Sequence, residues 1–312
     1  MAVGVALSLT AAVAACGSGN AGLSPSGTFV IGYQQGLGSA PLEIAKASGC
    51  MDGAAEGVNV EYKQFNSGSA IRDSMLAGTV QAGGVGLPPF LIGADKGIDW
   101  KVLAALNNME FRLMIQDPTL QSLADLGKDD QIAVPAPDSI QAIVLRKAAQ
   151  DQLGDAMALE QNFVSMAHPD AMQALLSGQV AAHMASAPFS YDEKDNGAQQ
   201  VVGSGDVFDE PINNTVVAVR QQVQESQPEM TKALRGCVEE AIGILNTDRD
   251  RAAKLLAKAS GGSESARSVK ADLAHHDLVW PHRTDGVAAV GSFMKEIGMI
   301  ENVPTLADIS QF

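Results

Sequence analysis

The chain has 312 residues and a formal net charge of -15, with 36 Asp and Glu against 21 Lys and Arg. This charge repels polyanions and no basic run offsets it, so the composition argues against a nucleic-acid partner. Hydrophobic residues make up 46% of the chain, which is enough to build the core of one large domain or of two lobes.

The N-terminal segment is apolar and uncharged, and it ends in Val13-Ala14-Ala15-Cys16. It is too short to span the ~30 Å hydrocarbon layer of a membrane, and it is typical of a lipoprotein export signal. We expect residues 1–15 to be a signal peptide, and lipidated Cys16 to anchor the protein to the outer face of the bacterial cell membrane. Residues 16–27, rich in Gly and Ser, would form a flexible tether. No Lys or Arg precedes the apolar part, which leaves open a disordered apolar N-terminus.

Three cysteines are too few for a disulfide framework. With Cys16 assigned to lipid, Cys50 and Cys237 remain, and they could pair in an oxidising compartment. The sequence does not place their Cα atoms within the ~7 Å that a disulfide needs. A bridge and two separate buried thiols therefore both remain open.

Strand and helix signals alternate from residue 28 onward. Short β-rich runs occupy residues 28–33, 58–62, 80–85, 102–106, 112–116 and 132–134. Helix starts are indicated at Ser39, Asn66-Ser67-Gly68, Pro88-Pro89, Pro137-Asp138-Ser139 and His168-Pro169-Asp170. From Pro228 the apolar residues keep a spacing of three to four, which predicts that most of the last quarter is helical. Strands that alternate with helices favour a doubly wound, mostly parallel sheet.

A near-repeat links residues 76–82 with residues 176–182, and a Pro-Phe pair follows each copy, at 89–90 and 188–189. In each copy a helix ends at a glycine, a strand follows, and a proline begins the next helix. We interpret this as two similar lobes that present strand ends to a shared crevice, the place where open α/β sheets bind ligands. The alternative is that any two helix–strand–helix units look alike.

Five segments carry a resemblance to a known family, in a fairly specific order and spacing. They are Ile31-Gly32-Tyr33-Gln34-Gln35, Phe65-Asn66-Ser67-Gly68-Ser69-Ala70, Leu76-Ala77-Gly78-Thr79-Val80-Gln81-Ala82-Gly83, Ser122-Leu123-Ala124-Asp125-Leu126-Gly127-Lys128 and Ala185-Ser186-Ala187-Pro188-Phe189. Through them, residues 28 to about 260 resemble the bacterial solute-binding proteins of ABC importers for nitrate, aliphatic sulfonates, taurine and thiamine-precursor pyrimidines. The family often has an acid at the positions of Gln81 and Ala181, so these departures leave the ligand class open.

The resemblance implies a two-lobed α/β fold of the periplasmic-binding-protein kind (type II). Each lobe would be a doubly wound, mostly parallel sheet flanked by helices, and two crossing strands would form a hinge on which the lobes close. We expect lobe one to comprise residues 28–112 and 218–312, and lobe two residues 113–217. The crossings would lie near residues 112–117 and 213–219.

The cleft between such lobes would be lined by the loops that end strands and begin helices. The candidate ligand-binding residues on these loops are Gln34, Gln35, Gly38, Ser39, Asn66, Ser67, Gly86, Leu87, Asn108, Asp138, Ser139, His183, Ser186 and Asn213. The set is rich in amides and hydroxyls and poor in Lys and Arg, and free N–H groups at helix starts can hold an anion without a cation. Each serine could equally be a plain helix cap, and His183 could be a core histidine.

Other chemistries find little support in the sequence. Gly36-Leu37-Gly38 lacks the third glycine of a dinucleotide fingerprint, and His275, His276 and His282 lack the spacing of a metal site. There is no G-x-S-x-G motif, and neither Cys50 nor Cys237 has a sequence-level reason to be activated. We therefore expect no cofactor, no metal and no catalytic residue.

These observations predict an extracytoplasmic lipoprotein that acts as a monomer. It would capture a small polar or anionic solute, such as a sulfonate, nitrate or a pyrimidine-like compound, and deliver it to the permease of an ABC importer. Two alternatives remain, a ligand-sensing subunit of a membrane receptor and an enzyme on the same fold.

Overall fold

The computed structural model describes residues 27–208, 212, 214–281 and 284–310. The predicted signal peptide, the lipidated Cys16 and all of the predicted tether except Gly27 lie outside the described residues, as does Asn213. Within the described parts of the chain, no helix is long and apolar enough to cross a membrane.

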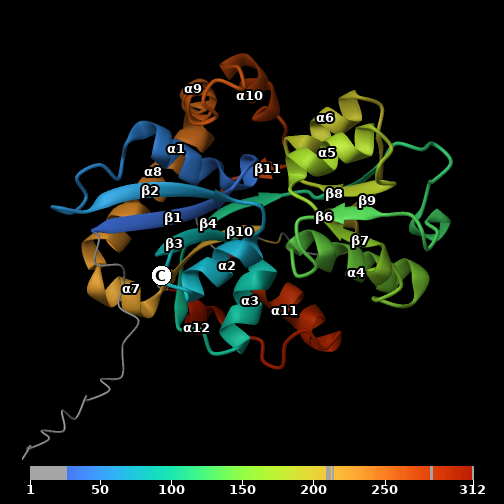
Figure 1. The fold of residues 1–312 in the computed structure, drawn as a ribbon, viewed down its shortest axis with the longest axis horizontal. Coiled ribbons are helices and arrows are strands. Elements are labelled where there is room, and N and C mark those ends of the chain that lie inside the picture. Colours follow the sequence, from blue (N-terminus) through green and yellow to red (C-terminus); the bar gives the residue numbers. More distant parts are fainter. Residues whose placement is uncertain (1–26, 209–211, 213, 282–283, 311–312) are drawn as a thin grey trace, which may run out of the picture.

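The structure contains two sheets, which form the centres of two lobes that lie side by side (Figure 1). The larger lobe contains β1 (Thr28–Gln34), β2 (Asn59–Phe65), β3 (Ala82–Gly86), β4 (Trp100–Met109), β10 (Thr215–Arg220) and β11 (Leu278–Val279), in the order β11-β4-β10-β3-β1-β2. The smaller lobe contains β5 (Arg112–Ile115), β6 (Ile132–Val134), β7 (Phe163–Ser165), β8 (Ala182–Ala185) and β9 (Gln199–Gly203), in the order β7-β6-β8-β5-β9. The two lobes predicted from the near-repeat are thus present.

Each sheet combines parallel and antiparallel pairs. The strands β1, β2 and β3 pair in parallel, as do β6, β7 and β8. In contrast, β10 and β5 each run antiparallel to both of their neighbours. The reason is that each of these two strands enters its sheet from the other lobe, at the edge where the parallel strands end. The sheets are therefore less parallel than the alternation of strands and helices indicated.

Two chain crossings join the lobes. The first is short, because β4 ends at Met109 and β5 begins at Arg112. The second runs from the end of β9 at Gly203 to the start of β10 at Thr215, and it includes the 3-10 helix η4 (Ser204–Asp206). Strand β5 therefore places Arg112 in the smaller sheet, and β10 places residues 215–217 in the larger one, a shift of one to three residues from the predicted boundaries.

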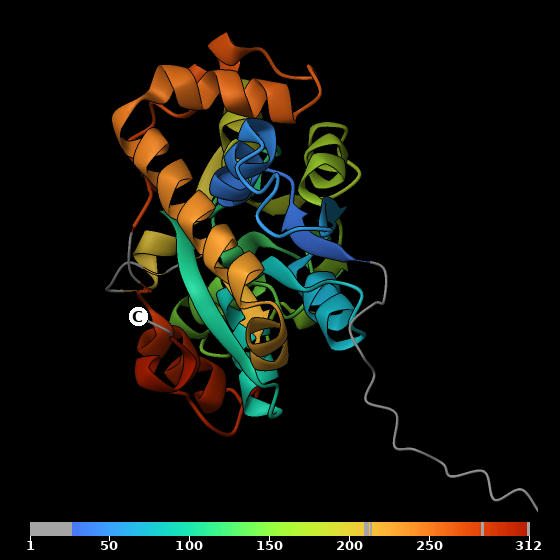
Figure 2. The same ribbon diagram turned by 90° about the vertical axis from the view of Figure 1, so that its left-hand side faces the viewer.

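Helices cover both faces of each sheet (Figure 1). On one face of the larger sheet lie α1 (Ala40–Ser48), α8 (Pro228–Thr247), α9 (Arg249–Ala259) and α10 (Ala266–Asp272), and on the other lie α2 (Gly68–Leu76), α3 (Leu87–Asp95), α11 (Val287–Glu296) and α12 (Leu306–Ile309). The short α7 (Gln221–Ser226) joins β10 to α8. The smaller sheet has α4 (Ile140–Leu153) on one face and α5 (His168–Leu176) and α6 (Phe189–Asp195) on the other. Figure 2 shows the long α8 running beside β4.

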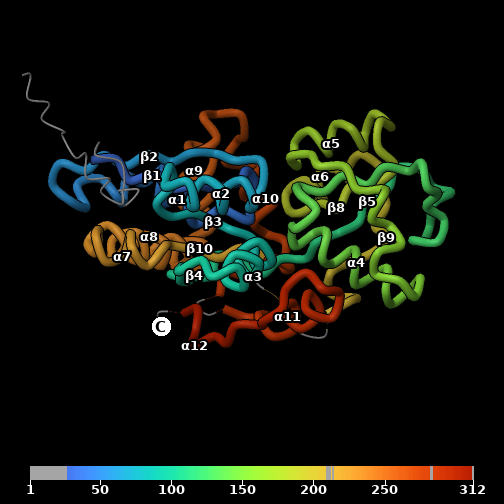
Figure 3. Tube along the Cα trace, turned by 60° about the horizontal axis from the view of Figure 1, so that its bottom comes forward, coloured from blue at the N-terminus to red at the C-terminus, as the bar shows by residue number. Residues whose placement is uncertain are grey.

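The hydrophobic core of the described residues has three parts: one mainly in the larger lobe, one that continues across both lobes, and a smaller one within the smaller lobe. Inside the larger lobe, Phe29 of β1 belongs to the same buried cluster as Leu42 of α1 and Leu234 of α8. The second cluster includes Phe90 of α3 and Ile143 of α4. Helix α11 contacts both α3 and α4, as the trace in Figure 3 shows, so it packs against both lobes.

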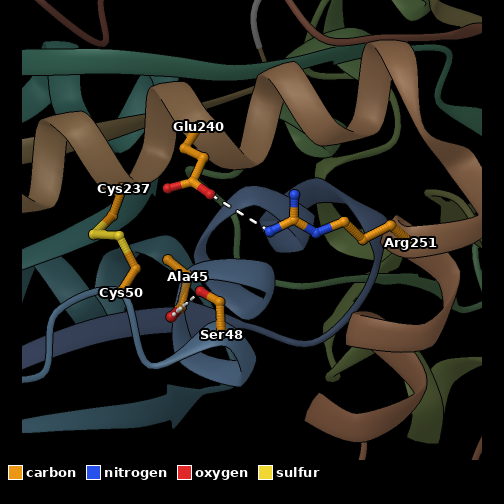
Figure 4. The surroundings of a disulfide bond; sticks show 6 residues. All are labelled: Ala45, Ser48, Cys50, Cys237, Glu240 and Arg251. Atoms are coloured by element: carbon orange, nitrogen blue, oxygen red, sulfur yellow. Dashed lines mark hydrogen bonds and ion pairs between the residues drawn. A yellow bond between two sulfur atoms is a disulfide. The ribbon is translucent and has the colours of Figure 1, made fainter.

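A disulfide bond joins Cys50 and Cys237, whose Cα atoms lie 5.8 Å apart (Figure 4). Cys50 follows α1 and Cys237 lies in α8, so the bond connects the N-terminal and C-terminal segments of the larger lobe. Beside it, Arg251 of α9 forms an ion pair with Glu240 of α8 at 3.6 Å. The question that the sequence left open is thus resolved in favour of the bridge.

Two predicted helix starts are capped as expected. The side chain of Ser67 accepts a hydrogen bond from the backbone N–H of Ala70, and Ser139 accepts one from Ala142, each at 3.2 Å. Ser39 precedes α1, but its hydroxyl accepts a bond from the N–H of Gln34 instead of capping the helix. The near-repeat is also confirmed, because a helix ends just before glycines 78 and 178, which have φ angles of 74° and 73°.

Candidate functional site

A cleft lies where strands of both lobes end. It is lined by Gln34, Gln35, Gly38, Ser39, Gly68, Gly86, Pro89, Met109, Phe111, Pro135, Ser139, Ile140, Gln141, His168, Ser186, Asn214 and Thr215. Gln34 ends β1, Gly86 ends β3, and Pro135 and Ser186 directly follow β6 and β8. Both lobes and both crossings thus contribute to one site, at the strand ends where open α/β sheets bind ligands. The cleft encloses about 40 Å³, room for only a few water molecules.

The described residues that line the cleft include no Lys, Arg, Asp or Glu. Their polar groups are amides, hydroxyls and one imidazole. Five helices begin at the cleft: Ser39 precedes α1, Gly68 opens α2, Gly86 precedes α3, Ser139 precedes α4 and His168 opens α5. The first N–H groups of a helix have no partner within it, and its N-terminus carries a partial positive charge. The cleft can therefore accommodate a polar group or an anion without a cationic side chain.

The structure brings half of the candidate residues into this cleft. They are Gln34, Gln35, Gly38, Ser39, Gly86, Ser139 and Ser186. Asn66 lines an adjoining hollow of about 190 Å³, which shares Gln34, Gln35 and His168 with the cleft. Asn108 lines a different hollow, beside Glu110 and Asp277.

Four other candidates do not line the cleft. Ser67 is occupied as the cap of α2, and Leu87 is completely buried in the core. Asp138 forms an ion pair with Arg72, and His183 is fully buried behind His168. The sequence placed these residues next to strand ends or helix starts, but it did not show which way each side chain would point. Contact of any candidate with a solute stays a prediction.

The ion pair of Asp138 crosses between the lobes. Its Oδ2 lies 2.7 Å from Nη1 of Arg72, and its Oδ1 accepts a hydrogen bond from the hydroxyl of Ser69. Arg72 and Ser69 lie on α2 of the larger lobe, whereas Asp138 precedes α4 of the smaller lobe. Asp138 therefore holds the two lobes together at one side of the cleft.

Further contacts hold the lobes together near the first crossing. Asp277 of the larger lobe accepts hydrogen bonds from Arg112 of β5 at 2.5 Å and from Tyr191 of α6 at 2.9 Å. The ring of His275 stacks on Tyr191 with the ring centroids 3.7 Å apart. These contacts, together with the small volume of the cleft, describe a closed arrangement of the lobes.

A buried hydrogen-bond chain leads from the cleft into the smaller lobe. Gln141 Nε2 lies 3.0 Å from His168 Nε2, His168 Nδ1 lies 2.8 Å from His183 Nε2, and His183 Nδ1 lies 2.5 Å from Glu193 Oε1. Burial lowers the pKa of His183 to about 3, and burial and then His183 lower the pKa of His168 well below its ordinary value. Burial, and then Asp192, raise the pKa of Glu193 to about 9. All three groups are therefore uncharged at neutral pH.

Sequence reasoning missed three polar residues that line the cleft, Gln141, His168 and Thr215, whereas Asn214 was expected beside Asn213 at the second crossing. Gln141 comes two positions after the capping residue of α4, and His168 is the first residue of α5. Asn214 donates from Nδ2 to the carbonyl of Met109 at 3.2 Å, while its buried Oδ1 has no partner in the described part of the chain. A search of the first turn of each predicted helix, beyond the capping residue itself, would have found Gln141 and His168, two of the three.

A second hollow of about 410 Å³ opens at the edge of the cleft and shares Gln35 with it. Its lining includes the carboxylates of Glu43, Glu264 and Asp272. Burial, then the charge of Glu264, raise the pKa of Glu43 to about 8, and burial with nearby acids raises that of Asp272 to about 6. This hollow is acidic, in contrast to the uncharged cleft beside it.

Replacing Ser139 by alanine should lower the free energy of unfolding by about 1 kcal/mol, because the N–H of Ala142 loses its cap. Ser67→Ala is the matched control, since it removes an equivalent cap outside the cleft. Urea unfolding should show similar losses for both variants. Only Ser139→Ala should also weaken solute binding, and an equal effect of both variants on binding would contradict the placement of Ser139 in the site.

Two lobes of mixed α/β sheet, joined by two crossings around a polar cleft, define the periplasmic-binding-protein fold. The chain belongs to the NMT1-like family, whose model matches residues 24–260. A search of the curated protein sequences found no match.

Solved structures of import components are similar to this chain along nearly its whole length. One is the alkanesulfonate-binding protein SsuA from Xanthomonas axonopodis pv. citri bound to MOPS, with 20% identity, a TM-score of 0.70, and coverage of 90% of this chain and 95% of that one. The periplasmic nitrate-binding protein NrtA from Synechocystis PCC 6803 has 14% identity, a TM-score of 0.72 and coverage of 92% and 86%. A zinc-bound ligand-binding component of an ABC-type import system from Staphylococcus aureus has 16% identity, a TM-score of 0.73 and coverage of 91% and 96%.

At these identities the similarity shows a shared fold. In the described part of this chain, no group of three or more His, Cys, Asp or Glu side chains could hold a metal ion. The bound groups of the similar structures are therefore not assigned to this chain by likeness alone.

Proposed function

We propose that this protein is an extracytoplasmic solute-binding protein that captures a small polar or anionic solute and delivers it to the permease of an ABC importer. The observation that carries the proposal is the cleft at the strand ends of both lobes, where the described lining residues supply amides, hydroxyls and helix N-termini but no charged side chain. Binding alone is the proposed activity, without a chemical step. The alkanesulfonate-binding and nitrate-binding proteins of the same fold support this role.

The proposed solutes are a sulfonate, nitrate or a pyrimidine-like compound. Each offers oxygen or ring-nitrogen acceptors to the N–H and hydroxyl donors of the cleft. Because the closed cleft encloses only about 40 Å³, the lobes must separate to admit any of the larger solutes. The lobe boundaries that we propose for this motion follow the strands: residues 28–109 with 215–310 for the larger lobe, and 112–203 for the smaller.

The proposed location is the outer face of the bacterial cell membrane, where residues 1–15 would be removed and Cys16 would carry the lipid anchor. The disulfide between Cys50 and Cys237 supports this location, because such bonds persist in oxidising compartments. The protein would then act as a tethered monomer, and its two lobes would both contact the permease.

Isothermal titration of the purified protein tests the binding role. We expect a 1:1 complex with at least one of taurine, ethanesulfonate, nitrate or a pyrimidine, and mass spectrometry should recover the solute unchanged. Gln34→Ala should weaken that complex about tenfold, the equivalent of one hydrogen bond. Gln173→Ala, on the exposed side of α5, is the matched control and should leave the affinity unchanged. Failure to bind any of these classes would contradict the proposal.

A further inference from the structure

The hydrogen-bond chain behind the cleft has one end in the site and one end in the interior. Gln141 and His168 line the cleft, whereas His183 and Glu193 are completely buried. Oε2 of Glu193 is also buried and has no hydrogen-bond partner among the described residues. The four side chains come from α4, α5, β8 and α6, so they connect much of the smaller lobe to a single point of the cleft.

The direction of hydrogen bonding in this chain depends on its proton count. A neutral imidazole donates from one nitrogen and accepts at the other. The hydrogen bonds made by two neutral histidines in series must therefore all run in the same direction. When Glu193 is ionised, His183 donates to it from Nδ1, His168 donates to His183, and Gln141 donates to His168. The carbonyl oxygen of Gln141 is then left for the cleft, as an acceptor.

One added proton reverses every bond in the chain. A protonated Glu193 donates to Nδ1 of His183, whose Nε2–H donates to His168 Nδ1. His168 then donates from Nε2 to the carbonyl oxygen of Gln141. This requires the amide to turn over from its orientation in the structure, where Nε2 faces His168, so that the NH2 group points to the cleft. If the proton instead lies on His183, its Nε2–H still donates to His168, so the result at Gln141 is the same.

The surroundings of Glu193 favour the proton-loaded direction. An ionised carboxylate with one oxygen unpaired in a dry interior is unfavourable, and burial raises the pKa of Glu193 to about 9. Helix α6 and the elements packed against it carry the following titratable and charged residues: Asp192, Lys194 and Asp195 on α6, His168 and Asp170 on α5, Arg112 on β5 and His183 on β8. Glu264 and Asp272 face Asp192. Arg112, the cation on the neighbouring strand β5, is already paired with Glu110 and Asp277.

We propose that Gln141, His168, His183 and Glu193 form a proton-coupled relay that decides whether the cleft meets its solute with a hydrogen-bond donor or an acceptor at Gln141. Gln141 is the residue that determines specificity, and the other three are positioning residues. The inference rests on the proposed function, because Gln141 can select only what this cleft binds. In the proton-loaded state the relay favours solutes that accept hydrogen bonds, including anions.

The tautomers of the two histidines report the direction of the relay without any solute. The experiment uses protein with 15N-labelled histidine and long-range 1H–15N correlation spectra of the rings between pH 6 and pH 10. At pH 7 we expect His168 to carry its proton on Nε2, and above about pH 9 to carry it on Nδ1. Glu193→Gln should hold one tautomer across the whole range. The matched carboxylate-to-amide variant on the same helix, Asp195→Asn, should behave like the wild type.

The proposal would be overturned if the tautomer of His168 stayed the same from pH 6 to pH 10 in the folded wild type. It would also be overturned if the tautomer changed with pH in Glu193→Gln. Because no solute is used, such a result would leave the binding role untouched, and a failed titration would leave the tautomer result standing. Proton linkage gives a further test with an anionic probe such as ethanesulfonate. Above the pKa of Glu193, the Kd of the probe should rise about tenfold per pH unit in the wild type and should stay constant in Glu193→Gln.

Discussion

Replacing Cys50 and Cys237 together by alanine should lower the free energy of unfolding by about 3 to 5 kcal/mol. The bond spans a sequence separation of 187 residues, and a cross-link across so long a loop removes much conformational freedom from the unfolded chain. In a protein of this size the loss corresponds to roughly 6 to 20 °C in melting temperature. Urea unfolding and thermal unfolding, both followed by circular dichroism, measure the two quantities.

Two controls separate the bond from the side chains that form it. Wild-type protein in a reducing agent should unfold like the double variant, because it lacks the same constraint. Ser48→Ala should remain within about 0.5 kcal/mol of wild type, since the serine lies beside the bond and only its local contact to the carbonyl of Ala45 is lost (Figure 4). Coincident midpoints for the oxidised wild type and the double variant would show that the disulfide adds no stability.

Asp138→Ala should shift the solute-free protein towards an open arrangement of the lobes. The substitution removes the 2.7 Å ion pair with Arg72 and the hydrogen bond from Ser69, both of which cross between lobes. The two charged side chains are 16% and 21% exposed, so solvent screens part of their attraction, and we expect a change of about 1 to 2 kcal/mol. This equals about a 5-fold to 30-fold change in the ratio of closed to open molecules. Small-angle X-ray scattering should show a larger radius of gyration.

Asp73→Ala is the matched control for this prediction. Asp73 is the other carboxylate that contacts Arg72, at 3.0 Å, but it lies on the same helix and is 65% exposed. Its removal leaves every contact between the lobes in place, so the scattering curve should match that of wild type. If Asp138→Ala also gave the wild-type curve, the ion pair would have no part in holding the lobes closed.

Much of the fold could be predicted because it depends on local patterns. The β-rich run at residues 28–33 is observed as β1, and the caps Ser67 and Ser139 lie at the starts of α2 and α4. The antiparallel direction of β5 and β10 could not be predicted in this way. It depends on where the chain crosses between lobes, which is a property of the whole molecule.

The candidate site was predicted as a region more accurately than as a set of residues. Carboxyl ends of parallel strands meet at one edge of a sheet, so the loops that contain Gln34, Gly86 and Ser186 could be assigned to the cleft. The orientation of individual side chains depends on packing between distant segments. The carboxylate of Asp138 is paired with Arg72, which lies 66 positions earlier in the sequence, and His183 lies behind His168 of the neighbouring helix.

The central position of β10 has a consequence for how the chain folds. This strand inserts between β3 and β4, although more than a hundred residues separate it from either in the sequence. The larger sheet therefore lacks its central strand until most of the polypeptide has left the ribosome. Contacts between residues so far apart in the sequence also form slowly. At the extracytoplasmic location that we propose, the chain would have to cross the membrane before it folds, and this delay would keep the nascent chain unfolded for longer.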